Sequence, residues 1–326
     1  MADLSRLSGK KFIIVGRAGM DFYPDPPGTK TEEATHFFSC LGGSSANIGV
    51  ALTRLGAQAD LVTCVSDDAI GRFALNELDK YGIGRAHVRS VGGEARNSLA
   101  VVESRIEDHQ SVIYRNGAAD FEMTHADVEA VDFGAYSALI TTGTVFAAEP
   151  SRSAAFRAFE LAKKAGLPLI FDVDYRPYSW PSADVAADVY SRAGALCDVI
   201  VGNDVEFGFM AGDFDRGLDK ARELVANGAA IAVYKMGEKG AVTITPEGEL
   251  STGIYRTKAL KPTGAGDSFM GGFVSGLTDG LTTHDAVLQG SATAAMVVAR
   301  VGCAPAMPTR AELDAFLADH AGPSAA

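Results

Sequence analysis

The stretch Lys261-Pro-Thr-Gly-Ala-Gly-Asp-Ser-Phe-Met-Gly-Gly-Phe273 is the most informative part of this chain, because it places one carboxylate among glycines at a predicted helix start. Pro262 and Gly264 break the preceding structure, and apolar residues then recur at helical spacing from Phe269. The first turn of a helix presents unpaired N–H groups and a positive dipole end, so an anion binds there. Asp267 beside such a site suggests a base that deprotonates a hydroxyl group attacking a phosphoryl group. The alternative is an acidic residue that only favours the helix start.

A second glycine-rich segment, Leu41-Gly-Gly-Ser-Ser-Ala-Asn-Ile-Gly-Val-Ala-Leu-Thr-Arg-Leu-Gly56, leads into a predicted helix with Asn47 near its start. Together the two segments resemble the ribokinase-like (PfkB) sugar kinases, which have Gly-Gly-x-x-x-Asn near the N-terminus and Thr-Gly-Ala-Gly-Asp near the C-terminus. The resemblance covers nearly the whole chain, because it continues through Asn203-Asp-Val-Glu206, Lys235-Met-Gly-Glu-Lys-Gly240 and Val301-Gly-Cys-Ala-Pro305.

The composition of the 326-residue chain, with 47% hydrophobic and 21% charged residues, predicts a soluble globular protein. An excess of 41 acidic over 29 basic residues argues against nucleic acid as a partner. No apolar run has the length of a membrane span, and no signal-peptide pattern begins the chain. We therefore expect a cytoplasmic enzyme whose four cysteines are reduced, buried thiols.

Short apolar runs alternate with stretches of helical periodicity. The predicted buried strands are Phe12–Val15, Leu61–Val65, Ala138–Thr142, Leu169–Val173, Val199–Gly202 and Ile231–Lys235. The predicted helices between them include Ser151–Lys164, Asp184–Gly194 and Leu218–Asn227. This order predicts βαβ units and a mostly parallel sheet with helices on both faces. With the resemblance, it implies a single ribokinase-like three-layer α/β/α domain over residues 1–326.

Two segments, at about 20–41 and 95–115, break this alternation. Ser98–Glu103 and Ser111–Arg115 have the pattern of paired strands. The resemblance implies that both segments form a small β-sheet lid over the sugar site, whereas the alternative is a pair of surface hairpins. Three phenylalanines in the first segment need burial somewhere, and a homodimer through the lid is a further expectation.

The resemblance assigns roles in phosphoryl transfer to the residues around Asp267. Asp267 removes the proton of the acceptor hydroxyl, while the amides of Gly264, Ala265 and Gly266, here called the anion hole, hold the charge that develops on the γ-phosphate of ATP. Thr263 either lends its hydroxyl to the phosphates or caps the helix.

The nucleotide side of the predicted site includes Asn203 and Glu206, which match a family Asn-x-x-Glu motif that places Mg²⁺ and the phosphates, largely through water. There are two alternatives. Asp204 could be the acid that places Mg²⁺, or Asn203, Asp204 and Glu206 could form only a polar turn after a strand. Lys235 ends a strand where α/β sheets bind ligands, and it either neutralises phosphate or is solvated. The nucleotide-binding set is Asn203, Lys235, Gly237, Gly240, Thr263, Gly264 and Gly266, and Glu206 is the magnesium residue.

The acceptor side includes Asp21, Gly42, Gly43 and Asn47, which match family positions that bind sugar hydroxyls. For Asn47, an ordinary helix-start residue is the alternative.

Three arginines suggest an acidic sugar. Arg17, Arg115 and Arg176 fall near one predicted mouth, and a guanidinium group binds a carboxylate bidentately. Each of them alone is also explained by a structural role. We select Arg115 and Arg176 as candidate substrate ligands, although Asp174, two residues before Arg176, stands where sugar-acid kinases have Asn.

Three longer segments of the chain narrow the range of expected substrates. Residues 16–30, 260–267 and 302–308 are similar to segments of kinases that act on a dehydro-deoxy-gluconate in bacterial myo-inositol breakdown. This likeness implies transfer from ATP to the primary hydroxyl remote from the carboxylate. A kinase for another sugar acid or a neutral ketose is the nearest alternative. A non-catalytic sugar sensor is disfavoured by the intact Asp267 motif. A nicotinamide dehydrogenase would need Gly-x-Gly-x-x-Gly after the first strand, which Gly16-Arg-Ala-Gly19 lacks.

Lys261-Pro262 departs from the family pattern, because many relatives have Asp-Thr there and that Asp helps bind a monovalent cation. An ammonium group repels a cation at short range, and Pro262 restricts the backbone of Lys261. We expect Lys261 to supply the cation's charge, so that potassium is not required. The alternative is a lysine turned outward into solvent.

Overall fold

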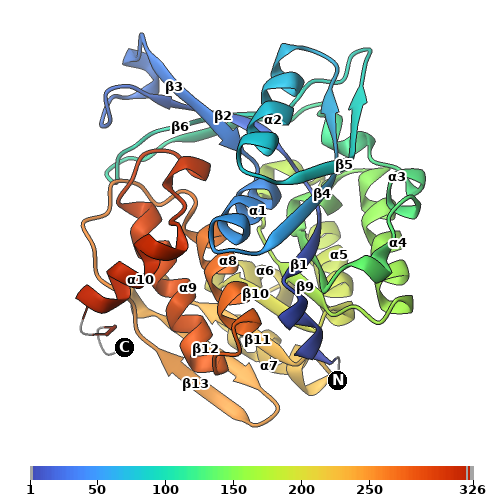
Figure 1. Ribbon diagram of the computed structural model, residues 1–326, viewed down its shortest axis with the longest axis vertical. Helices are drawn as coiled ribbons and strands as arrows, with labels where there is room; N and C mark the ends of the chain where they lie inside the picture. Colours follow the sequence, from blue (N-terminus) through green and yellow to red (C-terminus); the bar gives the residue numbers. More distant parts are fainter. Residues whose placement is uncertain (1–2, 321, 324–326) are drawn as a thin grey trace.

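The computed structural model describes residues 3–320 and 322–323. Within this part of the chain, the centre is a nine-stranded sheet (Figure 1). Its order is β13 (Gly248–Thr252), β12 (Ala241–Thr245), β11 (Ile231–Lys235), β10 (Val199–Asn203), β9 (Leu169–Asp172), β8 (Ala138–Thr142), β1 (Lys11–Val15), β4 (Gln58–Ser66) and β5 (Gly84–Val91).

In this order, the strands from β5 to β11 pair in parallel, and β12 pairs antiparallel with both β11 and β13. The six apolar runs predicted as strands are β1, β4, β8, β9, β10 and β11. Their inner residues are buried, because helices cover both faces of the sheet. The antiparallel pair β12–β13 carries polar residues on its outer strand, and the apolar runs gave no signal for it.

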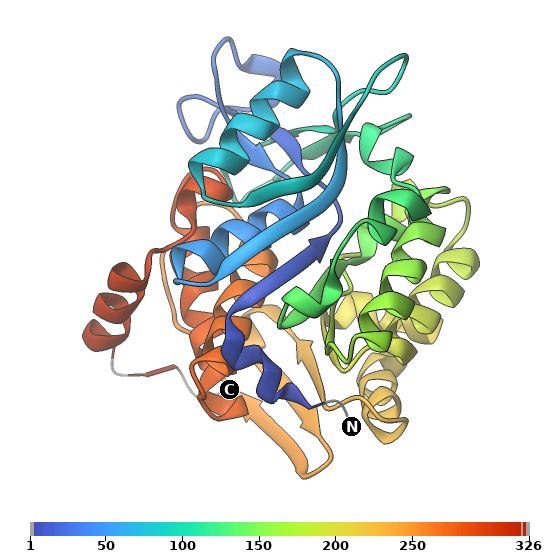
Figure 2. The same ribbon diagram turned by 45° about the vertical axis from the view of Figure 1, so that its right-hand side comes forward.

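The helices form two layers on opposite faces of this sheet (Figure 2). One apolar core contains α3 (His125–Glu129), α4 (Ser151–Lys164), α5 (Ala183–Leu196), α6 (Asp204–Ala211) and α7 (Gly217–Ala226). The other contains α1 (Ser44–Arg54), α2 (Ala69–Lys80), α8 (Ala265–Thr278) and α9 (Thr283–Val298), with α10 (Arg310–Asp319) packed outside α9. The predicted three-layer α/β/α class is confirmed.

A smaller sheet stands apart from the main one, at the top of Figure 1. Its order is β3 (Phe37–Gly42), β2 (Gly19–Pro24), β6 (Leu99–Val102) and β7 (Ser111–Tyr114). These strands come from the two segments that break the βα alternation. We call this sheet the lid sheet.

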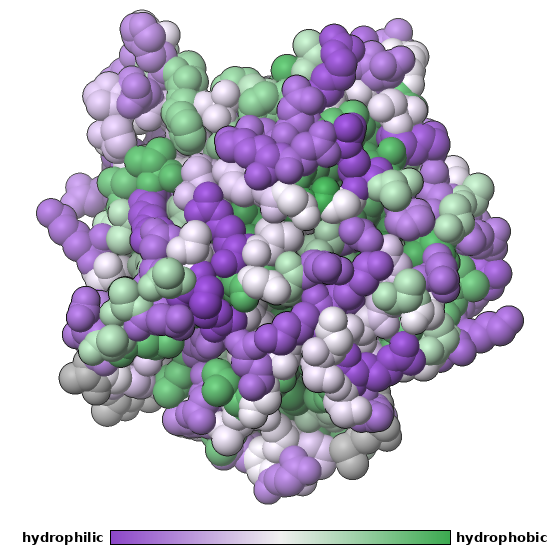
Figure 3. All heavy atoms as spheres, viewed as in Figure 1, coloured by the Kyte–Doolittle hydropathy of each residue, from purple (hydrophilic) through white to green (hydrophobic). Residues whose placement is uncertain are grey.

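The pairing register gives the lid sheet two different faces. Asp21, Ala100 and Ile113 lie in one cross-strand row on the inner face. Phe22, Val101 and Val112 lie in the next row, on the outer face. Phe37, Val112 and Tyr114 of the outer face are 42%, 45% and 61% exposed, and green apolar surface lies among polar side chains in this region of Figure 3.

Helices α1 and α8 approach each other closely. A Cβ atom on Gly271 of α8 would lie 2.3 Å from the Cβ of Ala51 of α1, so only glycine permits this contact. Because both helices begin at the carboxyl ends of the parallel strands, their first turns meet at the same edge of the sheet.

No helix in the described ranges, 3–320 and 322–323, is long and apolar enough to span a membrane.

Candidate active site

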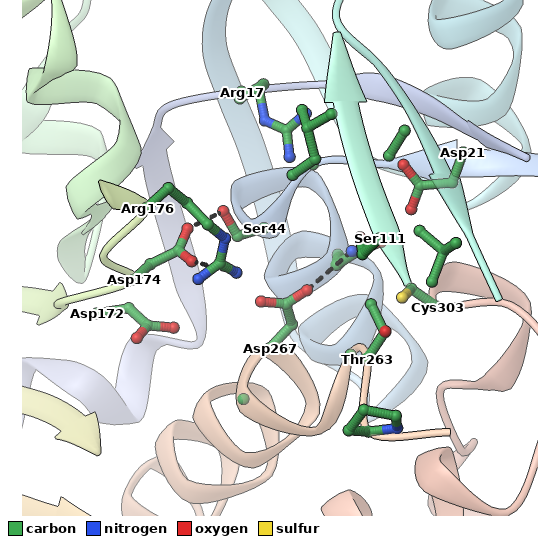
Figure 4. A pocket seen from close by; sticks show the side chains of 18 of the residues that line it. Arg17, Asp21, Ser44, Ser111, Asp172, Asp174, Arg176, Thr263, Asp267 and Cys303 are labelled. Carbon is green, nitrogen blue, oxygen red and sulfur yellow. Dashed lines mark hydrogen bonds and ion pairs between the residues drawn. The ribbon is translucent and has the colours of Figure 1, made fainter. Parts of the chain in front are cut away.

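A first cavity of about 390 Å³ lies between the lid sheet and the carboxyl ends of the central strands, which is within the size range of small-molecule sites. Figure 4 shows Asp21 and Ser111 entering it from the lid sheet and Asp267 from the start of α8. The remaining walls come from strand ends and from the start of α1. They include Arg17, Gly43, Ser44, Asn47, Asp172, Asp174, Arg176, Asn203, Glu206 and Lys235.

A second cavity of about 800 Å³ is lined by the segment 252–262, by the turn after β11 and by the facing sides of α8 and α9. More of its lining is apolar than in the first cavity, and it includes Gly237, Gly240 and Phe269. Asn203, Lys235, Pro262 and Gly266 line both cavities. The two cavities therefore meet at the start of α8.

The start of α8 has the geometry of an anion site. Gly264, at φ 85°, is the N-cap residue, and no side chain caps the first-turn amides. The left-handed backbone and the nearby sulfur of Cys303, 2.8 Å from where a Cβ would lie, both require glycine at position 264. The hydroxyl of Thr263 lies 3.5 Å from Nε2 of His109 in the lid-sheet loop, so Thr263 does not cap the helix.

Asp267 lies in the first turn of α8 and faces the first cavity. Burial raises the pKa of its carboxyl group to about 7, and the neighbouring Asp174 adds to this effect. The side-chain amide of Asn47 donates a 2.8 Å hydrogen bond to Asp267 Oδ2 and acts in the opposite direction. A base with a pKa near neutrality takes a proton and releases it again readily.

Asn203 and Glu206 form a capping box at the start of α6. One carboxylate oxygen of Glu206 accepts the Asn203 N–H at 2.7 Å, and the other accepts the Tyr175 N–H at 3.2 Å. Asp204 lines neither cavity, and its carboxylate accepts the adjacent Val205 N–H. Asn203 and Glu206, not Asp204, therefore face the site.

Magnesium fits this arrangement through water. Glu206 is buried with both oxygens already accepting one hydrogen bond, so its remaining lone pairs suit the water shell of a hydrated ion. Among the residues that the structure describes, no group of three or more Asp, Glu, His or Cys side chains is arranged to hold an ion directly. Water and phosphate oxygens would therefore complete the coordination.

Three further charged groups, Asp172, Asp174 and Arg176, lie at the end of β9 and just after it. Burial, reinforced by nearby Asp174 and Glu206, raises the pKa of Asp172 well above its usual range. Burial would also raise the pKa of Asp174, but Arg176 and the Ser44 hydroxyl hold it below its ordinary value. Arg176 Nη2 lies 2.7 Å from Asp174 Oδ1, and the Ser44 hydroxyl donates at 2.5 Å to Oδ2 (Figure 4).

Lys235 is at the end of β11, where both cavities meet. Its ammonium nitrogen would be 3.7 Å from a Cβ on Gly266 and lies over the ring of Phe269. A lysine here faces any anion bound at the anion hole.

Of the four residues predicted to bind sugar hydroxyls, three line the first cavity and one does not. Asp21, Gly43 and Asn47 line the first cavity. Burial raises the pKa of Asp21 to about 6, and Arg17 opposes this shift. Gly42 lies behind Asp21 and leaves room for its carboxylate, because a Cβ there would be 1.9 Å from Oδ1.

The structure does not bring Arg115 to the first cavity, contrary to the expectation from sequence. Its guanidinium group is buried in an ion pair with Asp120, donates to the Thr144 carbonyl at 2.9 Å and packs over Phe121. Arg176 and Arg17 do line the cavity.

Lys261 is completely buried, which rules out the lysine turned outward into solvent. Its ammonium group donates to the backbone carbonyls of Thr263, at 2.5 Å, and Val297, at 3.4 Å. Burial lowers its pKa, and the carboxylates of Asp267 and Asp21 act against this shift.

Sequence reasoning missed several residues of the site. Asp172 had a signal, because it ends a buried parallel strand, and Ser44 follows the glycine pair. His109 and Cys303 reach the site from a loop and the tail, and nothing in their spacing indicates it.

The fold and the site together are those of a small-molecule kinase, with a buried carboxylate and an uncapped helix start where two cavities meet. The model of the pfkB family carbohydrate kinases matches residues 10–310, and the chain belongs to that family.

Among its relatives are a 5-dehydro-2-deoxygluconokinase of Photobacterium profundum, 35% identical over 94% of each chain, and 5-dehydro-2-deoxygluconokinase 1 of Bacillus cereus (strain ZK / E33L), 37% identical over 94% of each. A crystal structure of a double mutant of Vibrio cholerae O395 fructokinase, with fructose, ADP and potassium bound, superposes with a TM-score of 0.82. It is 26% identical, and the match covers 94% of this chain and 98% of that one.

The Asn47–Asp267 hydrogen bond predicts a pH effect. As the predicted base, Asp267 would act unprotonated, and its pKa is about 7, so kcat/KM for the acceptor should fall as the pH drops below about 7. Asn47→Ala removes the donor that favours the carboxylate, so this acidic limb should move to higher pH. The measurement is a pH–rate profile at saturating magnesium and ATP. Thr53→Ala, at the far end of α1, is the control and should leave the limb in place, and an unmoved limb in Asn47→Ala would contradict the coupling.

Proposed function

We propose that this protein is an ATP-dependent kinase that phosphorylates 5-dehydro-2-deoxy-D-gluconate at its primary hydroxyl group, giving the 6-phosphate, in myo-inositol catabolism. The main support is the junction of the two cavities at the start of α8, with Asp267 on the side of the first cavity. The names of relatives at 35% and 37% identity support the sugar acid. We place the enzyme in the cytoplasm, where ATP is available.

In this proposal the sugar acid occupies the first cavity and ATP the second. Asp267 takes the proton of the primary hydroxyl as the hydroxyl oxygen attacks the γ-phosphorus, while the bond from that phosphorus to the bridging oxygen breaks and ADP leaves. The first-turn amides of the anion hole hold the charge on the transferred phosphoryl group. Lys235 faces the same charge from the end of β11. Asp21 and Asn47 orient the hydroxyl groups of the sugar. The lid sheet closes the cavity and excludes water.

Magnesium, bound with ATP, would neutralise phosphate charge and would be held through water by Glu206 and Asn203.

A kinase for 2-dehydro-3-deoxygluconate or for a neutral ketose is the alternative, and the structural likeness to a fructokinase at 26% identity favours it. Turnover measured on both sugar acids and on fructose separates these functions. A preference for fructose would reject the sugar-acid proposal.

Asp267→Asn tests the base. The variant should bind ATP and sugar acid but lose roughly 10²–10⁴-fold in kcat, because the positioned proton acceptor is removed. A loose phosphoryl-transfer transition state would reduce this figure. Asp204→Asn is the matched control, because Asp204 lines neither cavity, and it should retain its kcat. Near-normal turnover by a folded Asp267→Asn enzyme would reject the assignment.

Lys261 is proposed to replace a monovalent cation. Its buried ammonium group already donates to two backbone carbonyls beside the anion hole, and such carbonyl oxygens are also cation ligands. The rate should therefore be nearly the same in potassium and in tetramethylammonium, at constant ionic strength and saturating magnesium. A several-fold fall that potassium alone restores would show that a cation is still needed.

The lid sheet is proposed to pair two copies of the chain through its outer face. Phe37, Val112 and Tyr114 are exposed there, and an apolar patch on a lid is more stable when covered. Sedimentation velocity should give a dimer for the wild-type protein and a monomer for Val112→Glu. Leu281→Glu, at an exposed site before α9, should remain dimeric. A wild-type monomer at micromolar concentration would reject this interface.

A further inference from the structure

The arginines near the first cavity differ in whether an anion of the protein already neutralises them. Arg115 pairs with Asp120, and Arg176 pairs with Asp174. Arg17 lines the cavity, yet no carboxylate in the described part of the chain lies within 4.0 Å of its guanidinium nitrogens.

Arg17 is also deeply buried, with only 7% of its surface exposed. One of its terminal N–H groups donates to the Ser98 hydroxyl at 3.0 Å, while its Nε is buried without a partner. An unpaired buried charge is costly, and so is a buried donor without an acceptor. A site for an anionic ligand accounts for both features.

Arg17 is held rigidly in this position. It follows β1, at the carboxyl end of a central parallel strand, and its carbonyl accepts the Ala46 N–H of α1 at 3.2 Å. Figure 4 shows its guanidinium group directed into the cavity, on the side away from Thr263. A fixed, planar fork of donors is the group that recognises a carboxylate.

We propose that Arg17 binds the carboxylate of the sugar acid and sets the preference for an acidic over a neutral sugar, with Ser98 holding the guanidinium group in place. This inference rests on the proposed sugar-acid substrate. Arg176 has a lesser part, because Asp174 neutralises it. The carboxylate then lies at Arg17 while the primary hydroxyl at the other end of the molecule reaches Asp267.

A phosphate group of ATP is the other source of an anion for Arg17. The two sources give different kinetics. If Arg17 binds the sugar carboxylate, its loss changes KM for the sugar acid and leaves KM for ATP unchanged. If it binds phosphate, KM for ATP rises and the preference between sugars stays.

The experiment compares wild-type enzyme, Arg17→Met, Arg17→Lys and Arg176→Lys. Each is assayed on 5-dehydro-2-deoxy-D-gluconate and on the same compound with its carboxylate reduced to a hydroxymethyl group. Arg17→Met should lower the ratio of kcat/KM values, acid over reduced analogue, by about 10²-fold or more. Arg17→Lys should lose less, because it keeps the charge but not the bidentate geometry. Arg176→Lys should keep most of the preference.

Stability provides a readout that does not depend on turnover. Arg17→Met removes an unpaired buried charge, so the Tm of the ligand-free protein should be unchanged or higher. The rise in Tm that the sugar acid causes without ATP should be lost in Arg17→Met and kept in Arg176→Lys. A fall in ligand-free Tm together with equal losses on both sugars would assign Arg17 to the fold and overturn the proposal.

The outcomes separate this inference from the proposed function. If wild-type enzyme does not prefer the acid to the reduced analogue, the sugar-acid function itself falls. If wild-type enzyme prefers the acid and Arg17→Met keeps that preference, only the role of Arg17 falls. A raised KM for ATP in Arg17→Met with unchanged sugar preference assigns the guanidinium group to phosphate.

Discussion

The hydrogen bond from Asn47 to Asp267 links the two halves of the site, since Asn47 belongs to α1 near the N-terminus and Asp267 to α8 near the C-terminus. The bond depends on the close contact of these helices at Gly271 and Ala51. Any separation of α1 from α8 would lengthen it and leave a buried carboxylate with one donor fewer. The packing of α1 against the glycine-rich α8 thereby holds the Asp267 carboxylate in place and supplies a donor that opposes the rise in its pKa.

The acidic groups of the first cavity differ in whether a cation of the protein compensates them. Asp172, Asp174, Glu206 and Asp267 share the cavity wall, and burial disfavours the charged form of each. Arg176 compensates Asp174, while Lys235 acts on Asp172 and Glu206. Asp267 has no cation in direct contact among the described residues, so its pKa stays near neutrality. Arg176 thus holds Asp174 as a carboxylate, whereas the pKa values of Asp172, Glu206 and Asp267 are raised. Such a split among neighbouring acids is typical of a functional site.

The fold could be predicted from local patterns, whereas side-chain partners depended on contacts between distant segments. Apolar runs located six strands, and the helix starts at Asn47 and Asp267 followed from glycines and spacing. The sequence placed Arg115 at the end of a lid strand but gave no sign that Asp120, five residues on, would bind its guanidinium group. The direction of Lys261 likewise depended on the Val297 carbonyl of α9, 36 residues away. The direction of such a side chain is set by tertiary contacts with other segments, which local sequence patterns do not reveal.

Side-chain contacts join the lid sheet to the segments on both sides of the anion hole. The Tyr23 hydroxyl of β2 lies 3.0 Å from the Cys303 sulfur, with either atom as donor, and Cys303 fills the space beside Gly264. The same strand carries Asp21 into the first cavity. From the other side of the lid sheet, the loop after β6 brings His109 within 3.5 Å of the Thr263 hydroxyl. A displacement of the lid sheet would therefore move groups on both sides of Gly264. In the proposed function, packed side chains would then couple acceptor binding under the lid sheet to the geometry of the anion hole.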